Sequence, residues 1–130
     1  MSVKKGILLF AHGARDPAWA QPFEAAALRL TQRAEQQADT QVRLAFLEFM
    51  SPNISQAGTE LAELGCTQVT VVPLFLGAGG HVRKDLPRLL DELTALHTNV
   101  QWRLSPAVGE TELLIQALAD SAWALANPTD

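Results

Sequence analysis

The sequence predicts an α/β fold, namely an open four-stranded parallel sheet in the order 2-1-3-4 with helices on both faces. The first observation is that four short apolar runs alternate with four longer segments whose apolar residues recur every three or four positions. Strands separated by helices pair in parallel through right-handed crossovers. The second observation is that the first and third runs are almost continuously apolar, as central strands are, whereas the second and fourth carry polar residues, as strands near an edge do.

The four strands are expected at residues 5–11, 42–49, 68–76 and 99–104. With the order 2-1-3-4, the direction of the chain across the sheet reverses between the first and third strands. This reversal creates a crevice at the carboxyl ends of these two strands, and ligands of open parallel sheets bind in such crevices.

Each of the first two helices has a recognisable start. Asp16 before Pro17 predicts one start, and Ser51 before Pro52 predicts the next, because an acceptor side chain followed by proline is typical of a helix N-terminus. The second helix is expected to stop at Gly65. The other two helices are expected at about 83–96 and 110–126. All the tryptophans fall on apolar faces and are expected in the core, namely Trp19, Trp102 and Trp123.

Composition indicates a single globular domain, residues 1–130, with 48% hydrophobic and 18% charged residues. A net charge of −4 argues against general nucleic-acid binding. No segment approaches the roughly 20 apolar residues that cross a membrane, and no signal peptide is recognisable, so a cytoplasmic protein is expected. Cys66 is the only cysteine, which excludes an internal disulfide and favours a small buried thiol.

Two histidines and one glutamate, His12, Glu48 and His81, each follow an apolar run. If the runs are parallel strands, all three side chains lie at the same edge of the sheet. Neutral imidazole is a good ligand for cobalt, nickel, zinc or ferrous iron, and a carboxylate compensates charge. Imidazole also accepts protons near neutral pH. The three residues are therefore candidate metal ligands and catalytic groups, unless each histidine merely caps a strand or bonds to a loop.

Basic residues follow both histidines. Arg15 comes three residues after His12, and Arg83 and Lys84 follow His81 closely. In a chain with only 10 lysines and arginines, this concentrates positive charge around the candidate site and indicates an anionic substrate. The alternative is that these bases are simply solvated.

A glycine-rich turn that contains Gly79 and Gly80 precedes His81. It matches neither a dinucleotide fingerprint nor a Walker loop. It is expected to let a flat ligand approach the backbone or to let His81 move, and the alternative is a turn that needs glycine only for positive φ.

Three stretches carry a family resemblance, at residues 8–17 (LLFAHGARDP), 45–49 (AFLEF) and 72–82 (VPLFLGAGGHV). Together they resemble the class II tetrapyrrole chelatases, most of all the short-form sirohydrochlorin cobaltochelatases. The resemblance implies a chelatase-like half-domain that inserts Co²⁺ into sirohydrochlorin in cobalamin biosynthesis, with no cofactor beyond this divalent metal substrate. It implies His12 and His81 as metal ligands and Glu48 as the active-site acid. It also implies a homodimer that stands in for longer relatives with two such domains in one chain.

Several alternatives stay open from the sequence. The metal could be iron, for siroheme, or nickel, because the same ligands serve all three. A carrier would bind metal or tetrapyrrole without accelerating insertion. Ala11-His12-Gly13 is also similar to the Arg-His-Gly of histidine phosphatases, but Ala11 occupies the arginine position.

Overall fold

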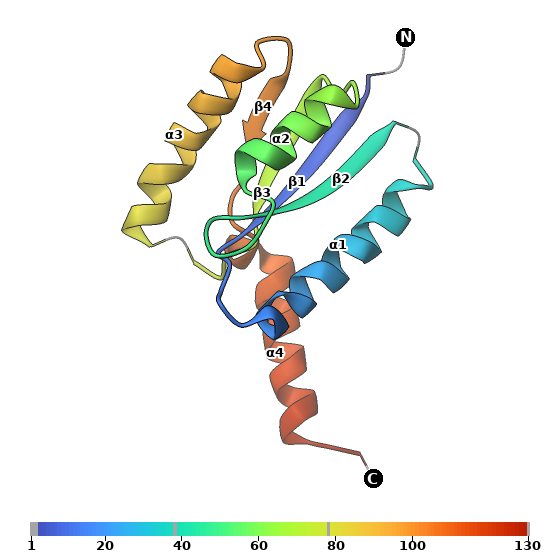
Figure 1. Ribbon diagram of the computed structural model, residues 1–130. Helices are drawn as coiled ribbons and strands as arrows, with labels where there is room; N and C mark the ends of the chain where they lie inside the picture. The colour runs from blue at the N-terminus through green and yellow to red at the C-terminus, as the bar shows by residue number, and fades with distance from the viewer. Residues whose placement is uncertain (1–2, 38, 78, 130) are drawn as a thin grey trace.

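A computed structural model describes residues 3–37, 39–77 and 79–129, apart from the side chains of residues 80–83. Four strands alternate with four α-helices, and two short 3-10 helices, η1 and η2, precede α1 and α4 (Figure 1). In chain order the elements are β1 (Lys5–Ala11), η1 (Pro17–Ala20), α1 (Gln21–Ala34), β2 (Thr40–Phe46), α2 (Ile54–Glu63), β3 (Gln68–Pro73), α3 (Gly80–Leu96), β4 (Gln101–Leu104), η2 (Val108–Glu110) and α4 (Glu112–Ala126).

The sheet has the predicted order, β2-β1-β3-β4, and every pair of neighbouring strands is parallel. Leu8 in β1 lies opposite Arg43 in β2 and Val71 in β3, which defines the register of the centre. Because all four strands run the same way, their carboxyl ends lie at one edge of the sheet. The reversal between β1 and β3 is therefore where the sequence predicts it.

The two faces of the sheet carry separate cores, as alternation along a strand requires. Leu8 and Phe10 in β1 belong to a core that also contains residues of α2 and α3. Leu9 belongs to a second core on the opposite face, where residues of α1 pack, and Ala11 to a third that includes Ala20 of η1. Trp19 and Trp102 pack against these cores, as expected, and are half-buried.

Helix α4 does not join either layer. Figure 1 shows it extending away from the carboxyl edge of the sheet, with its C-terminal end far from the other elements. The expectation that Trp123 lies in the core is wrong, because this side chain is 73% exposed. Apolar spacing indicates that a helix has a face to bury, but it does not indicate which surface buries it.

Several element boundaries differ from the prediction. Helix α2 begins at Ile54, because Asn53 caps it in a box with Gln56, so the expected start at Ser51 and Pro52 is wrong. The expected start at Asp16 is confirmed, since its carboxylate accepts a hydrogen bond from the Ala18 N–H at 2.9 Å.

Strands β2 and β3 end at Phe46 and Pro73, three residues before their predicted ends. Helix α3 begins at Gly80, three residues earlier than expected, so His81 lies in its first turn. Helix α4 begins at Glu112 with Thr111 as its cap, after η2. In the described part of the chain, no helix is both long and apolar enough to span a membrane.

The predicted burial of Cys66 is confirmed, since the residue is 1% exposed and lies in the core under α2 and α3. Its Sγ lies 3.5 Å from the backbone oxygen of Lys5. Burial raises the pKa of the Cys66 thiol, because a thiolate would lose its hydration there. The thiol is therefore a structural group.

Candidate functional site

Backbone hydrogen bonds join the segment that follows β1 to the segment that follows β2. The Leu47 N–H donates to the Ala11 oxygen at 2.9 Å, and the Glu48 N–H donates to the His12 oxygen at 3.0 Å. His12 and Glu48 therefore lie side by side in the backbone at the carboxyl edge of the sheet, and both residues are exposed to solvent. An imidazole and a carboxylate are thus presented together at this edge.

Gly13 makes this close approach possible. Its φ is +90°, and a Cβ placed on it would lie 1.8 Å from the Glu48 carbonyl oxygen. Phe49 also has a positive φ of 66°, and the Met50 N–H donates to the Glu48 oxygen at 2.8 Å. Glu48 therefore sits in a tight turn against Gly13, and only glycine fits at position 13.

The ring of His12 packs on the ring of Phe75, with centroids 4.3 Å apart and an interplanar angle of 34°. Phe75 follows β3 and is 2% exposed. The exposed imidazole of His12 therefore packs against the buried ring of Phe75, and this contact limits the orientations that His12 can adopt. Sequence reasoning missed Phe75, because it lies in a run of three apolar residues and nothing local indicates which of them turns toward His12.

Arg15 and Phe49 also meet at this edge. The guanidinium carbon of Arg15 lies 5.0 Å from the centroid of the Phe49 ring, which is cation–π distance. Both residues are exposed, so their charge and apolar face are available to a ligand. Phe49 is a second residue that sequence reasoning missed, although it directly follows Glu48.

The third predicted ligand lies where β3 passes into α3. His81 is the second residue of α3, and Gly79 is the N-cap, which supplies no side-chain capping bond. Lys84, three residues further along α3, is exposed. The side chains of His81 and Arg83 are outside the described residues, so their prediction as site residues stays a prediction.

Gly79 itself has neither of the usual steric reasons to be glycine. Its φ is −68°, and no atom lies within 4 Å of a Cβ placed on it. Positive φ therefore does not explain this glycine. Gly80 begins the helix, and its expected role beside a ligand also remains a prediction.

Within the described residues, no three histidine, cysteine, aspartate or glutamate side chains are arranged so that they could hold a metal ion. The predicted set includes His81, which lies outside that comparison. His12 and Glu48 supply one nitrogen and two oxygens between them, which is an incomplete ligand set for a transition metal. At least one further residue must supply a ligand to complete it.

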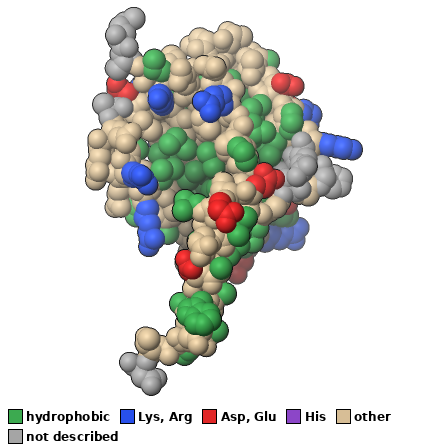
Figure 2. All heavy atoms as spheres, turned by 180° about the vertical axis from the view of Figure 1, so that it is seen from behind, with side chains coloured by type: hydrophobic (Ala, Val, Ile, Leu, Met, Phe, Trp, Pro, Cys, Tyr) green, Lys and Arg blue, Asp and Glu red, His purple; other side chains and the backbone are tan. Residues whose placement is uncertain are grey.

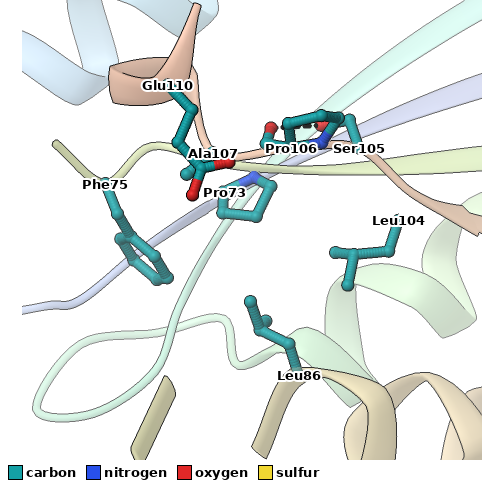
Figure 3. A pocket seen from close by; sticks show the side chains of 8 residues that line it. All are labelled: Pro73, Phe75, Leu86, Leu104, Ser105, Pro106, Ala107 and Glu110. Atoms are coloured by element: carbon teal, nitrogen blue, oxygen red, sulfur yellow. Dashed lines mark hydrogen bonds between the residues drawn. The ribbon is translucent and has the colours of Figure 1, made fainter. Parts of the chain in front are cut away.

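A cavity of about 310 Å³ opens at the same edge, between the ends of β3 and β4 and the side of α3 (Figure 3). Phe75 lines it and also contacts His12, so the cavity adjoins the candidate site. The other lining residues are Pro73, Leu86, Leu104, Ser105, Pro106, Ala107 and Glu110.

Among the described residues that line the cavity, Glu110 alone is ionisable, and Figure 3 shows its carboxyl group beside Ala107 and Pro73. Sequence reasoning treated Glu110 only as a helix start. The signal that could have found it is the one used for Glu48, namely an acidic residue shortly after a strand of the same parallel sheet.

A parallel sheet of this order, with a histidine and a glutamate together at its carboxyl edge, fits the class II tetrapyrrole chelatases that the sequence resembles. Residues 6–123 match the sequence model of the CbiX family, and the chain belongs to this family.

Relatives with curated functions agree with this assignment. The sirohydrochlorin cobaltochelatase of Sulfurisphaera tokodaii is 29% identical over 115 residues, which are 88% of each chain. The same enzyme of Saccharolobus solfataricus is 36% identical over 85 residues, which are 65% of this chain and 62% of that one.

Solved structures share the fold. A protein of Marinobacter aquaeolei VT8 assigned to cobalamin (vitamin B12) biosynthesis as CbiX has a TM-score of 0.80 and 32% identity, over 96% of this chain and 99% of that one. The sirohydrochlorin chelatase SirB of Bacillus subtilis subspecies spizizenii, in complex with cobalt, has a TM-score of 0.76 and 27% identity, over 95% and 52%. SirB of Bacillus subtilis with Fe³⁺ has a TM-score of 0.77 and 25% identity, over 97% and 49%. This chain thus spans about half the length of the two SirB chains.

Proposed function

We propose that the protein inserts Co²⁺ into sirohydrochlorin, as a lyase of cobalamin biosynthesis. The observation that carries the proposal is the backbone pairing of His12 with Glu48 at the carboxyl edge of the sheet. Family membership and the functions of the relatives support it.

The chemistry of insertion suits these residues. Metallation removes two pyrrole N–H protons and delivers a partly dehydrated cation to the macrocycle. His12 and His81 hold the incoming metal, one of them also accepts a proton, and Glu48 assists by balancing charge. Because His12 is exposed, it can reach a ligand that lies outside the sheet edge.

The substrate is an anionic tetrapyrrole, since sirohydrochlorin carries many carboxylates. Arg15 lies at the site edge against Phe49, so it is placed to bind one of them. Lys84 and Arg83 add positive charge near the start of α3. The first N–H groups of this helix, at Gly79 and Gly80, have no side-chain cap and can also receive a carboxylate.

Cobalt is the proposed metal because the curated relatives are cobaltochelatases. SirB structures hold cobalt in one case and Fe³⁺ in the other, so the fold accommodates both. Competition between Co²⁺, Fe²⁺ and Ni²⁺ at equal concentration, with sirohydrochlorin as acceptor, tests the choice, and preferential insertion of iron or nickel would overturn it.

Two further expectations belong to the proposal. The working form is a homodimer, which supplies the second domain that longer relatives carry in one chain. The protein acts in the cytoplasm.

Single-histidine variants test the site. We expect His12→Ala and His81→Ala each to lower the rate of cobalt insertion by about 10²-fold or more. His97→Ala is the matched control, because His97 caps the far end of α3 and its Nε2 bonds to Thr59. Full activity of both site variants would refute the assignment.

Turnover separates the chelatase from a carrier. A chelatase metallates many equivalents of sirohydrochlorin per protomer, which the absorption spectrum of the product reports. A carrier binds one equivalent and does not exceed the spontaneous rate.

A further inference from the structure

Phe49 holds a backbone conformation that a phenylalanine rarely adopts. Its φ is +66°, in the left-handed region, where the Cβ lies too close to the following carbonyl oxygen. Among the residues that the structure describes, Asp39 is the other non-glycine residue with a positive φ, and a short polar side chain tolerates it better because it can bond locally. Backbone strain of this kind persists where the surrounding structure enforces it, and it concentrates at functional sites.

The loop that carries Phe49 is fixed by backbone hydrogen bonds. The Phe46 N–H donates to the Pro52 oxygen at 2.9 Å, and this bond closes the loop. Inside the loop, the Met50 N–H donates to the Glu48 oxygen at 2.8 Å, so that Phe49 lies at the centre of a tight turn. Phe49 is therefore held next to Glu48, whose own N–H bonds to the segment that follows β1.

The ring of Phe49 does not serve the core. Phe49 is 57% exposed and belongs to none of the three core clusters that the described residues form. Its ring contacts the Arg15 guanidinium, but an exposed cation–π contact stabilises less than the left-handed backbone costs a phenylalanine. Neither the core nor Arg15 therefore accounts for a phenylalanine at this position, whereas contact with a ligand would.

Two leucines add exposed apolar surface at the same edge. Leu47 follows β2 and is 36% exposed, and Leu76 follows β3 and is 69% exposed. Because β1 lies between β2 and β3, His12 lies between the two segments. Neighbouring strands are about 4.8 Å apart, so these segments begin about 10 Å apart. Apolar surface therefore extends on both sides of the imidazole, over a width that a macrocycle spans and a single pyrrole does not.

The surroundings of Phe49 differ from those of other exposed apolar side chains. Figure 2 shows apolar side chains gathered at the centre of the side opposite the view of Figure 1, and others along α4. Broad apolar surfaces of this kind suit another protein surface. Phe49 lies instead among ionisable groups, with Arg15 over its ring and Glu48 next to it in the chain. A flat ring with charged neighbours suits a ligand that is flat and apolar in the middle and ionic at its periphery.

We propose that the Phe49 ring stacks on the macrocycle of sirohydrochlorin while Arg15 binds one of the peripheral carboxylates. The inference deepens, and rests on, the proposed function, and it assigns Phe49 as a substrate-binding residue. Because the Arg15 guanidinium lies over one face of the ring, the macrocycle uses the opposite face. A conjugated macrocycle offers a π-face, and offset stacking on an aromatic ring is favourable there.

The strained turn has a use in this arrangement. A side chain on a flexible loop loses conformational freedom when it binds a ligand, and this loss weakens binding. Phe49 loses less of it, because the hydrogen bonds on both sides of Glu48 already fix its backbone. The cost of the left-handed conformation is met on folding, and the ring is in place before the substrate arrives.

Binding of metal-free sirohydrochlorin to the full chain tests the stacking contact. Phe49→Ala removes the ring and should raise the Kd, measured by equilibrium dialysis, by about 10-fold. Phe49→Trp retains a flat aromatic face and should keep the Kd within about 2-fold of the wild-type value. A wild-type Kd for Phe49→Ala, or a Phe49→Trp protein that binds as weakly as Phe49→Ala, would overturn the proposal.

Phe49→Gly distinguishes loss of the ring from damage to the loop. Alanine retains the cost of the positive φ and glycine removes it, so the urea midpoint of Phe49→Gly should lie about 0.5 M above that of Phe49→Ala. Both variants lack the ring and should bind sirohydrochlorin equally weakly. Recovery of the wild-type Kd by Phe49→Gly would show that binding depends on the loop conformation, which contradicts the stacking contact.

Asp39→Gly is the matched control. Asp39 has a φ of +64° and directly precedes β2, at the end of the sheet opposite the candidate site. The same relief of a positive φ there should leave the Kd for sirohydrochlorin unchanged. A loss of binding as large as that of Phe49→Ala would show that the assay reports stability and not contact with the ligand, and would refute the assignment of Phe49.

Cobalt insertion measured on the same samples separates this inference from the proposed function. A wild type that inserts cobalt, together with a Phe49→Ala protein of unchanged Kd, refutes the stacking contact alone. A wild type whose sirohydrochlorin binding depends on Phe49 but which inserts no metal refutes the function alone. A wild type that does not bind sirohydrochlorin overturns both.

Discussion

Replacement of Gly13 by alanine is expected to damage both the stability of the fold and the candidate site. The φ of +90° costs an alanine about 1–2 kcal/mol. In addition, the new Cβ would lie 1.8 Å from the Glu48 carbonyl oxygen, which must retreat beyond 3.0 Å. That retreat breaks the hydrogen bond from the Met50 N–H to the Glu48 oxygen, worth about 1 kcal/mol. We expect the free energy of unfolding to fall by about 2–3 kcal/mol.

Gly65→Ala isolates the conformational part of this loss. Gly65 has a φ of +93°, but the nearest atom to its added Cβ is the Cδ of Lys4, at 3.7 Å. We therefore expect a loss of about 1–2 kcal/mol and unchanged cobalt insertion for Gly65→Ala. Urea titration followed by circular dichroism measures both variants. Equal destabilisation of the two proteins would refute the reasoning that the Glu48 carbonyl is what requires glycine at position 13.

Three further outcomes are expected. Iodoacetamide should alkylate Cys66 far more slowly in the folded protein than in urea, because the thiol is buried. Because folding raises the pKa of this thiol, the free energy of unfolding should fall as the pH rises through the folded-state pKa. Asn53→Ala should lower the free energy of unfolding by about 1 kcal/mol, and Ser51→Ala should leave it nearly unchanged, since Asn53 and not Ser51 caps α2. Arg15→Ala should raise the KM for sirohydrochlorin by about 10-fold with little change in kcat, whereas Arg88→Ala, which removes an exposed pair with Glu92, should change neither.

The sheet order could be predicted because central and edge strands bury different amounts of side chain. A strand that is covered on both faces must be apolar at every position, and residues 69–76 nearly meet this condition. An edge strand can carry polar residues, because part of it faces solvent. Local chemistry likewise predicted the cap at Asp16. It failed at Ser51, because two acceptor residues lie within three positions and only Asn53 has a glutamine three residues later to complete the capping box.

At the candidate site, the sequence by itself determined which chemical groups end the strands. His12 and Glu48 follow predicted strands, and neighbouring parallel strands end at the same edge, so their proximity follows from strand order. The packing of His12 on Phe75 did not follow, nor did the approach of Arg15 to Phe49. Both contacts depend on how the chain turns after each strand, and that turn is decided by long-range packing.

The sequence therefore determined the order of the strands, the starts of some helices and the polar residues at the carboxyl edge, because each leaves a pattern within one element. Only the tertiary structure decided which surfaces meet. It placed Glu110 at a cavity beside Phe75, and it left the apolar side chains of α4 exposed. The physical reason is that hydrophobic burial is not directional. An apolar face must be covered, and its sequence carries no information on what covers it.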